Sequence, residues 1–593
     1  MELVDTLALG ASAFGREGSS PFIRTRLNAR IVSLWGRFLI AYPNPSRLWY
    51  YRINIQDSEG NEKVLMSKVA QYLNEHLLGE VSNLTSLRAS YARDESVFDI
   101  TPEIVVFPKV TNDVRKVARF SWQLAEKGHT LSLTPRGLGT DTTGGAVGSG
   151  ILIDLSRHLN SILYVSTKDK NKIVHVQPGV ALRTLHETLK WHGLTIGAYT
   201  PDTPDMTVGG AIAAGSVGRT SGKYGTVADA VERMEVVLAN GDLMETGRIN
   251  KRELSRKKGE QTLEGEIYRQ IDGIIEDNAE LIASLSSDND NLGYRIDKVK
   301  DKDGSFDLTS LFVGSQGTLG IISEVVLKTD FYSDDESVLV VVCKTAEEAR
   351  DITDILRQLD PAVLEVIDGA YYEEARERGK RFIFDSDNDS FAGLVYASFD
   401  DFSDKARTRK LKKAAKLLSR RDAKLYTSED SRLEDLYAVR DVEQSMVLPQ
   451  RVDESPVFMC DSAYIPAGRL EDFIGEVGVL AEKLHVKLAL KVNVLTGIVS
   501  TYPTVHFKKV SDKQKIFKLA TEYAALVHKA GGTIAGAQAE GRINAFAGYA
   551  QLDEAVVDLN ASIRKVFDPF ATLNPGVKQS SDLKVLARQL RSE

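Results

Sequence analysis

Glycine is unevenly distributed along this chain, and its clusters constrain the fold more than any other feature. The first cluster, PRGLGTDTTGG at residues 135–145, follows a strand-like stretch, HTLSL. Glycine permits tight turns and lets successive backbone N–H groups point at one spot, so such a loop can hold phosphate oxygens. Thr142 replaces the third glycine of a G-x-G-x-x-G motif, and no acidic residue closes a βαβ unit, which excludes a Rossmann fold. By itself the loop is equally typical of a flexible connection.

Further glycine motifs follow downstream, so the first loop is part of a series. They are, in order, TVGGAIAAG at residues 207–215, KYGTVAD at 223–229, GSQGTLGII at 314–322 and FDPFATLNPG at 567–576. Between residues 100 and 330, short β-rich runs alternate with these turns, and Asn240-Gly241 between apolar runs predicts a hairpin.

The pattern of expected strands and helices changes near residue 335. SVLVVVCK predicts a strand, and the next helical stretch begins with Thr345 and Glu348, which form a capping-box pattern. PAVLEVID then predicts another strand, and a similar series recurs through residue 508. We therefore expect a second α+β domain.

Composition limits the class of protein. The 593 residues are too many for one hydrophobic core, and the net charge of −8 argues against nucleic acid as a partner. The two cysteines, Cys343 and Cys460, exclude a disulfide scaffold, a Cys-based zinc site and an Fe–S cluster. No stretch is long and apolar enough to span a bilayer, and the acidic residues near the start do not fit a secretion signal, so we expect a cytoplasmic protein.

The five ordered motifs resemble the FAD-binding domain of the vanillyl-alcohol oxidase/p-cresol methylhydroxylase (PCMH-type) superfamily, from about residue 100 to 578. The chain is most similar to the branch that holds D-lactate dehydrogenase, glycolate oxidase and D-2-hydroxyglutarate dehydrogenase. The resemblance implies an α+β fold, with a two-subdomain FAD domain and a ferredoxin-like cap. We accordingly divide the chain into a partly helical, basic N-terminal extension (1–99), an FAD-binding domain (100–332), a cap or substrate domain (333–555) and a C-terminal segment that returns to the FAD domain (556–593).

The resemblance also implies which residues bind FAD. The first loop would hold the pyrophosphate, the next motifs would line the adenosine and the flavin ring, and Asn574 would lie near the ring. The first loop contains neither His nor Cys, so we expect noncovalent FAD. The predicted FAD-binding residues are Arg136, Gly137, Leu138, Gly139, Thr140, Gly144, Gly145, Thr207, Gly209, Gly210, Gly215, Ser216, Tyr224, Gly225, Gly317, Thr318, Ile321, Ile322 and Asn574. Gln316 is a mild departure, because relatives have Glu in G-S-E-G-T-L-G.

The chain departs from its relatives at their metal site. Relatives carry H-x-G-D-G-N-x-H and G-E-H-G, in which two His and a Glu hold a divalent metal and the last His is the proposed base. Here the equivalent positions are Leu495, Tyr502, Ala537 and, in place of the base, Gln538. Leu and Ala cannot ligate a metal and Gln cannot act as a base near neutral pH, so we expect no metal.

Candidate catalytic residues come from the same motifs. Arg440 lies where relatives place an Arg that clamps the substrate carboxylate, and a surface ion pair is the alternative. Tyr502 could be a donor, or a base if its pKa were depressed, and Glu540 could be a base if it points inward. Gln538 and Arg542 complete the predicted catalytic set.

Two segments are strongly basic despite the acidic total. Residues 1–53 hold seven Arg and three acidic residues, and a helix there would place Arg26, Arg30 and Arg37 on one stripe. Residues 405–424 hold ten basic side chains and one acid. A solvated surface or docking on the core is the ordinary explanation. One alternative is contact with the inner face of an anionic membrane. The other is contact with an acidic electron-transfer partner.

The function that follows from the resemblance is oxidation of a small, anionic hydroxy compound, with hydride transfer to flavin N5, no divalent metal, and a quinone or other carrier as acceptor. One alternative is a metal-independent flavoenzyme of another class, similar to aldonolactone oxidases or alkylglycerone-phosphate synthase. Another is a flavoprotein that has lost catalysis.

Overall fold

The structure is a computed structural model, and it describes residues 68–592. Gaps in this description fall at residues 168–171, 199–204, 286–289, 332–334, 386–391, 422–423, 445–454 and 506–508. The basic segment 1–53, with its predicted Arg stripe, lies outside the described residues. Helices account for 42% and strands for 19%, which confirms a mixed α+β fold.

A small sheet carries the first glycine loop. Its order is β1-β2-β4-β3, with β1 antiparallel to β2 and the other strands parallel. The three parallel strands are almost entirely buried, as expected where both faces of a sheet are covered. The strands are β1 (Glu80–Ser82), β2 (Ile104–Phe107), β3 (Leu133–Arg136) and β4 (Ile151–Asp154).

A second sheet of five antiparallel strands follows, in the order β5-β6-β10-β8-β9. The hairpin predicted at Asn240-Gly241 joins β8 to β9, and Gly241 takes the positive φ of 81° that this turn requires. The strands are β5 (Ile162–Ser166), β6 (Ile173–Val176), β8 (Val231–Val237), β9 (Leu243–Glu245) and β10 (Ile321–Lys328).

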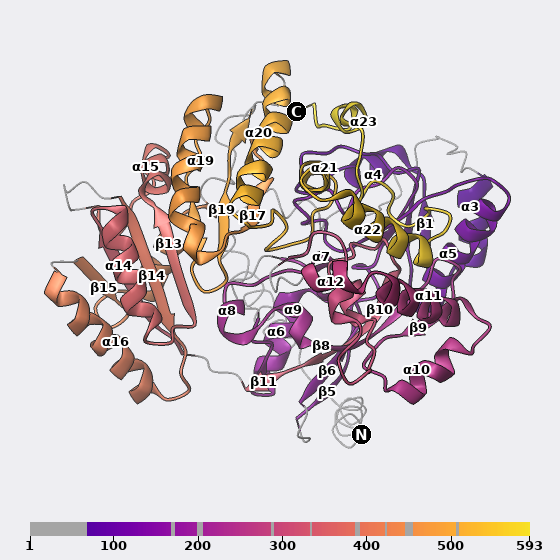
Figure 1. Cartoon of the computed structure of the whole chain (residues 1–593), viewed down its shortest axis with the longest axis horizontal. Helices are drawn as coiled ribbons and strands as arrows, with labels where there is room; N and C mark the ends of the chain where they lie inside the picture. Colours follow the sequence, from indigo (N-terminus) through magenta and orange to yellow (C-terminus); the bar gives the residue numbers. More distant parts are fainter. Residues whose placement is uncertain are drawn as a thin grey trace, which may run out of the picture. The chain divides into compact units, whose positions relative to one another are not determined.

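Helices surround these two sheets (Figure 1). One of them, α7, begins at Thr207, whose side chain accepts a hydrogen bond from Gly210 N, and ends at Gly215 in the left-handed conformation. The helices are α3 (Lys68–His76), α4 (Thr85–Ser90), α5 (Thr111–Glu126), α6 (Leu182–Trp191), α7 (Val208–Ala214), α8 (Ser221–Tyr224), α9 (Val227–Ala230), α10 (Lys251–Lys258), α11 (Leu263–Asp277), α12 (Ala279–Ser284) and α13 (Thr309–Phe312). Two short strands, β7 (Leu194–Thr195) and β11 (Asp330–Phe331), pair with each other.

The cap contains a seven-stranded antiparallel sheet, β15-β12-β14-β13-β18-β19-β17. Its first four strands have the order of a ferredoxin-like unit, and a second strand–helix series extends the sheet by pairing β18 with β13. The predicted cap is therefore present but wider than one ferredoxin-like unit. The strands are β12 (Ser337–Cys343), β13 (Val363–Asp368), β14 (Gly393–Phe399), β15 (Lys424–Thr427), β17 (Cys460–Tyr464), β18 (Lys491–Asn493) and β19 (Ile498–Thr501).

Two separate apolar layers cover the cap sheet. One packs α14 and α16, the latter through Leu411, against sheet side chains such as Val341 and Val395, and the other faces α15 and α17 through Val340 and Tyr396. Thr345 caps α14 by accepting a hydrogen bond from Glu348 N, as its sequence predicts. The helices are α14 (Ala346–Arg357), α15 (Gly369–Glu377), α16 (Asp404–Leu418), α17 (Leu433–Arg440), α19 (Leu470–Leu484) and α20 (Val510–Lys529). A short pair, β16 (Ser455–Pro456) and β20 (Thr504–Val505), completes the cap.

The C-terminal part of the chain returns to the first sheet. The backbone N–H of Leu133, in β3, donates to Thr572 O at 2.8 Å. The carbonyl oxygen of Leu133 accepts from Asn574 N, also at 2.8 Å. The NPG motif is thereby fixed beside the first glycine loop. The last helices are α21 (Ile543–Tyr549), α22 (Glu554–Phe567) and α23 (Leu583–Arg588). No helix among the described residues is long and apolar enough to span a bilayer.

Candidate functional site

A pocket opens where the glycine motifs meet. It is partly open to solvent and is lined largely by Gly, Ala and Pro residues. Its wall combines the first glycine loop, the N-terminal part of α7, the 315–322 loop and Gln538 from the cap side. Motifs more than 400 residues apart in sequence thus converge on one cavity.

Most of the predicted FAD-binding residues line this pocket. They are Arg136, Gly137, Leu138, Gly139, Thr140, Gly145, Thr207, Gly209, Gly210, Ser216, Gly317 and Ile322. The sequence analysis did not single out Asp141, Pro178, Met206 or Gln316 as pocket residues, although they also line it. Pro178 and Met206 carry no motif of their own and reach the pocket only through the fold.

The first glycine loop is held in shape by side chains that point away from its rim. Asp141 accepts hydrogen bonds from Thr143 N (2.8 Å) and Gly145 N (2.9 Å). The guanidinium group of Arg136 donates to the carbonyl oxygens of Tyr91, Arg93 and Ala146. Arg136 therefore braces the loop from behind, and the loop backbone is left to contact an anionic ligand.

Gln316 joins three parts of the pocket wall. Its Nε2 donates to Thr143 Oγ1 (2.9 Å) and to Asp141 Oδ2 (3.3 Å), while its Oε1 accepts from Gly541 N (2.9 Å). An amide can both donate and accept, whereas a carboxylate can only accept. The Glu that relatives have at this position would face the carboxylate of Asp141, so the departure to Gln matches its surroundings.

The other predicted FAD-binding residues lie outside the pocket lining. Asn574 is fully buried and donates to Gly145 O (2.7 Å) and Gln316 O (2.8 Å), so it ties two glycine loops together from behind. Thr318 bonds Tyr294, and Ile321 packs in the core. The Tyr224 hydroxyl donates a hydrogen bond to Asp400 of the cap. Gly144, Gly215 and Gly225 each adopt a positive φ at a turn. These residues shape the walls.

Glycine at two positions allows the loops of the pocket wall to approach one another closely. A Cβ at Gly317 would lie 2.3 Å from Pro135 Cγ, and one at Gly137 would lie 2.4 Å from Thr207 Oγ1, so the loops approach too closely for larger residues. A Cβ at Gly210 would meet only Thr207 Oγ1, at 3.0 Å. Gly137 and Gly317 are therefore required by the packing of the wall, whereas a side chain at Gly210 would have more room. None of the described residues that line the pocket is His or Cys, which are the attachment sites for covalent flavin in relatives.

Behind Gln538, which lines the pocket, lies the carboxyl group of Asp461, which no sequence motif marks. Gln538 Nε2 donates to Thr142 Oγ1 and lies 3.4 Å from Asp461 Oδ2, and Thr142 Oγ1 lies 3.2 Å from the same oxygen. Burial raises the pKa of Asp461 to about 6. Asp461 follows Cys460 in β17 without any motif, and only the pairing of the cap strands brings it to Gln538.

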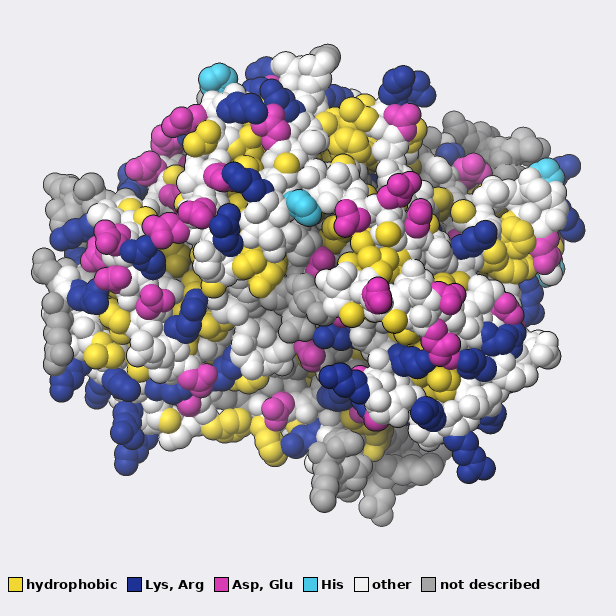
Figure 2. All heavy atoms as spheres, viewed as in Figure 1, with side chains coloured by type: hydrophobic (Ala, Val, Ile, Leu, Met, Phe, Trp, Pro, Cys, Tyr) yellow, Lys and Arg dark blue, Asp and Glu magenta, His cyan; other side chains and the backbone are white. Residues whose placement is uncertain are grey.

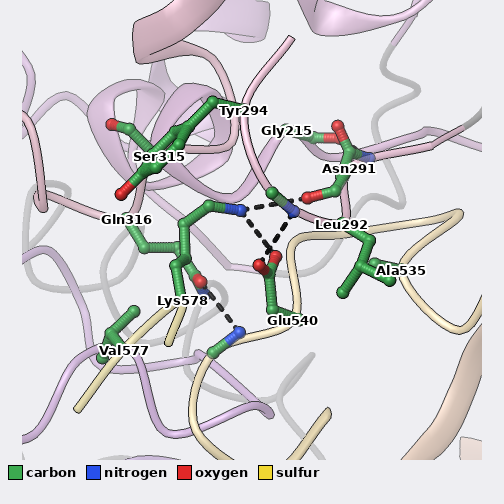
Figure 3. Close-up of polar contacts among 12 residues, drawn as sticks. Gly215, Asn291, Leu292, Tyr294, Ser315, Gln316, Ala535, Glu540, Val577 and Lys578 are labelled. Carbon is green, nitrogen blue, oxygen red and sulfur yellow. Dashed lines mark hydrogen bonds and ion pairs between the residues drawn. The ribbon is translucent and has the colours of Figure 1, made fainter. Parts of the chain in front are cut away.

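Glu540 and Lys578 form a fully buried ion pair (Figure 3). Glu540 Oε2 lies 2.5 Å from Lys578 Nζ, its Oε1 accepts from Gly293 N, and Lys578 Nζ also donates to Asn291 O. Burial raises the pKa of Glu540 and lowers that of Lys578. Glu540 points inward, as its role as a base requires, but it points at Lys578 and not into the pocket.

Arg542 and Tyr502 also lie outside the pocket lining. Arg542 donates to the carbonyl oxygens of Gly144, Val147 and Pro575, which is a bracing arrangement. Burial raises the pKa of Tyr502, so the depressed pKa that a base would need is absent and its hydroxyl stays a donor. Of the predicted catalytic set, Gln538 lines the pocket.

Arg440 belongs to a charged cluster between the cap and the loop after α7. Its guanidinium binds Asp441 through two hydrogen bonds, of 2.9 and 2.7 Å. Arg219 bridges Asp441 (2.9 Å) and Glu365 (3.1 Å). Lys491 binds Glu443 at 2.6 Å and Glu365 at 3.4 Å, so three cations face three carboxylates. Arg219 is three residues beyond Ser216 of the pocket lining, but none of the six charged residues of the cluster lines the pocket itself.

Leu495 and Ala537, two positions that the sequence aligns with the relatives' metal ligands, have side chains without donor atoms. Leu495 packs beside Gly222, and Ala537 hydrogen-bonds through its backbone to Val217 and Ser462. Within the described part of the chain, no three His, Cys, Asp or Glu side chains converge as a metal centre would require.

Fold and pocket together define a two-part FAD-binding protein, and comparison with known families agrees. A family model described as an FAD binding domain matches residues 102–247, and one described as the C-terminal domain of FAD linked oxidases matches residues 333–577. The chain thus carries both domains of the FAD linked oxidases, and FAD is its cofactor.

Relatives of known annotation come from the branch expected from the sequence. The chain is 25% identical to D-2-hydroxyglutarate dehydrogenase of Haemophilus influenzae, covering 85% of this chain and 50% of that protein. It is 24% identical to glycolate oxidase subunit GlcD of Bacillus subtilis, covering 80% of this chain and 90% of the relative. The chain thus spans about half the length of the D-2-hydroxyglutarate dehydrogenases it matches.

Solved structures share the fold at low sequence identity. p-Cresol methylhydroxylase with substrate bound aligns with a TM-score of 0.63 at 13% identity, covering 87% of this chain and 96% of that one. At this identity the likeness concerns the fold alone.

Proposed function

We propose that this protein is an FAD-dependent dehydrogenase that oxidises a small anionic hydroxy compound without a divalent metal. One observation carries the proposal: a carboxyl group with a raised pKa, Asp461, is hydrogen-bonded to Thr142 and adjoins Gln538, which lines the FAD pocket. Oxidation of an alcohol needs a hydride acceptor and a proton acceptor, and Asp461 adjoins the pocket that would hold the first of these.

FAD, held by the glycine loops that line the pocket, would supply the hydride acceptor for the carbon that bears the hydroxyl group. The hydroxyl proton must go elsewhere for the carbonyl product to form. In this proposal Asp461 takes that proton in its ionised form. A pKa of about 6 leaves the carboxylate mostly ionised at neutral pH while keeping it a stronger base than an exposed Asp. Gln538 and Thr142 donate toward Asp461 Oδ2 and hold the carboxyl group in place.

The absence of a metal is supported by residue chemistry at the relatives' ligand positions. Leu495 and Ala537 have no donor atoms in their side chains, and Tyr502 keeps its proton because burial raises its pKa. Charge stabilisation of the substrate therefore falls to protein groups.

The charged cluster supports an anionic substrate. Arg440 already binds the carboxylate of Asp441 through a bidentate fork, which is the geometry that a substrate carboxylate would need. In the proposal, the substrate carboxylate replaces Asp441 on this fork. Electrons then pass from the reduced cofactor to a quinone or another carrier.

The test is an anaerobic bleaching screen. The purified holoprotein is mixed with 2-hydroxy acids, polyols and sugar lactones, and loss of the visible flavin absorbance is followed. We expect reduction by at least one 2-hydroxy acid, slowed at least hundred-fold in Asp461→Asn with unchanged FAD content. Acid precipitation should release the flavin, which tests noncovalent binding. Reduction by lactones alone would favour the aldonolactone-type alternative, and flavin that only dithionite reduces would favour a non-catalytic flavoprotein.

A further inference from the structure

The outer surface of the cap carries a stripe of cations without acidic partners. Lys405, Arg409, Lys413 and Lys416 lie on α16 at intervals that place them on one side of the helix, and all four are exposed. Among the described residues, no carboxylate lies within 4 Å of any of them, and Figure 2 shows Lys and Arg side chains gathered at the lower left, over α16. We call these four residues the α16 stripe.

Other cations of the same region are neutralised locally. Buried Arg407 binds Asp335 and Asp404, Lys410 binds Asp360 and Asp401, and Arg421 binds Asp351. The basic residues of α16 therefore divide into a paired set, which includes Lys412 through Glu429, and an unpaired set that faces outward and has no acidic partner among the described residues. Only the unpaired set is available to an external anion.

Two exposed aromatic rings lie at the start of the same helix. Phe402 is 67% exposed and Phe331 is 59% exposed, and their ring centroids lie 6.4 Å apart in an edge-to-face arrangement. Lys172 Nζ lies 3.5 Å above the Phe331 ring. Large rings exposed beside cations are an energetic cost in water, and they are the combination that partitions into the interface of a lipid bilayer.

We propose that the α16 stripe and the Phe331–Phe402 pair dock the protein on the surface of an anionic phospholipid bilayer. Lipid phosphates would bind the stripe and the two rings would enter the headgroup layer. An acidic protein carrier would need access to the flavin. The stripe, however, lies over the cap-sheet face opposite to the one that holds Tyr396 and the charged cluster proposed to bind the substrate. A bilayer needs no such proximity, and it also explains the rings.

The experiment measures binding of the full-length holoprotein to vesicles by co-sedimentation. We expect binding to vesicles that contain phosphatidylglycerol and no binding to pure phosphatidylcholine. Binding should be lost at high salt, because salt screens the attraction between the cations and the lipid phosphates. The variant Arg409→Gln/Lys413→Gln should bind about thirty-fold more weakly, since each basic residue near an anionic surface contributes about 1 kcal/mol. Phe402→Ser should bind about ten-fold more weakly.

The control variant, Lys251→Gln/Arg252→Gln, removes the same charge from exposed positions of α10 and should change binding less than three-fold. All three variants should keep the thermal stability and FAD content of the parent, because the altered side chains are exposed. Failure of the parent to bind phosphatidylglycerol vesicles, or equal loss in the control, would overturn the proposal. So would unchanged binding in Phe402→Ser together with equally tight binding to soluble polyglutamate, which would assign the stripe to an acidic protein.

Discussion

At the scale of single residues, the pocket wall is held together by buried side-chain amides that hydrogen-bond to neighbouring loops. Gln316 donates to Asp141 and Thr143 and accepts from Gly541, and Asn574 donates to the loops on both sides. Each of these groups is buried, so a change that leaves one unpaired costs about 1–3 kcal/mol. The identity of these residues is therefore fixed by their partners.

The pairing of Gln316 with Asp141 can be tested by exchange. Gln316→Glu removes two donated hydrogen bonds and places a second carboxylate beside Asp141, so we expect a loss of about 2–4 kcal/mol in unfolding free energy and reduced FAD content. Adding Asp141→Asn should restore at least half of the lost unfolding free energy and of the lost FAD content, because the introduced amide can donate a hydrogen bond to the new carboxylate. Additive losses in the double variant, measured by denaturant unfolding, would contradict this account.

The buried pair of Glu540 and Lys578 makes a second prediction. Glu540→Gln leaves a buried ammonium group without its counter-charge and should destabilise the protein by about 3–5 kcal/mol. The double variant Glu540→Gln/Lys578→Met removes both charges and should regain most of that loss. Urea unfolding of the three proteins measures the coupling, and a double variant as unstable as the single one would refute the ion pair.

Asp461 predicts a pH dependence of stability. Its pKa is raised from 3.8 to about 6, so between these pH values the folded state holds a proton that the unfolded state releases. Its contribution to stability is therefore present below pH 3.8 and is lost as pH rises through about 6. Asp461→Asn should be about 2 kcal/mol more stable than the parent at pH 8, with a difference near zero at pH 4. Unfolding midpoints at the two pH values check this, and equal differences would contradict the shift.

At the scale of elements, the pocket is made by turns at the ends of strands and helices. β3 leads into the first glycine loop, α7 begins at the capping residue Thr207, and the loop before β10 supplies Gly317 with its positive φ of 73°. Small residues at these turns keep the cavity open, since Gly137, Gly209 and Gly210 all line it. Side-chain volume, more than charge, decides whether the cofactor fits.

Filling the cavity should therefore remove FAD without unfolding the chain. Gly210→Leu adds a side chain where a Cβ meets only Thr207 Oγ1, so we expect at least a ten-fold loss of FAD affinity. The matched control is Gly478→Leu, in helix α19, where a Cβ meets nothing within 4 Å. Flavin content after purification and circular dichroism distinguish the two; retained FAD in Gly210→Leu would place the cofactor elsewhere.

At the scale of the whole molecule, much of the architecture was predictable and part of the site was not. The hairpin at Asn240-Gly241 follows from a local pattern, whereas the fold class and the FAD cofactor follow from the family resemblance of the glycine motifs; the structure and the comparisons confirm all three. Asp461 was not predictable, because no motif marks it and it reaches Gln538 across 77 residues through the cap sheet. For the same reason the pairing of Glu540 with Lys578, 38 residues further along the chain, could not be predicted from the sequence. Local signals specify turns and strands, whereas long-range polar pairs depend on the completed fold.

The central claim is that this FAD-linked oxidase family member works without the divalent metal of its relatives. Its most direct test compares the holoprotein before and after dialysis against a strong chelator, using the 2-hydroxy acid that bleaches the flavin fastest. We predict less than one divalent metal per chain by elemental analysis and the same rate of anaerobic flavin reduction in both samples. A stoichiometric metal whose removal abolishes reduction, and whose return restores it, would contradict the account.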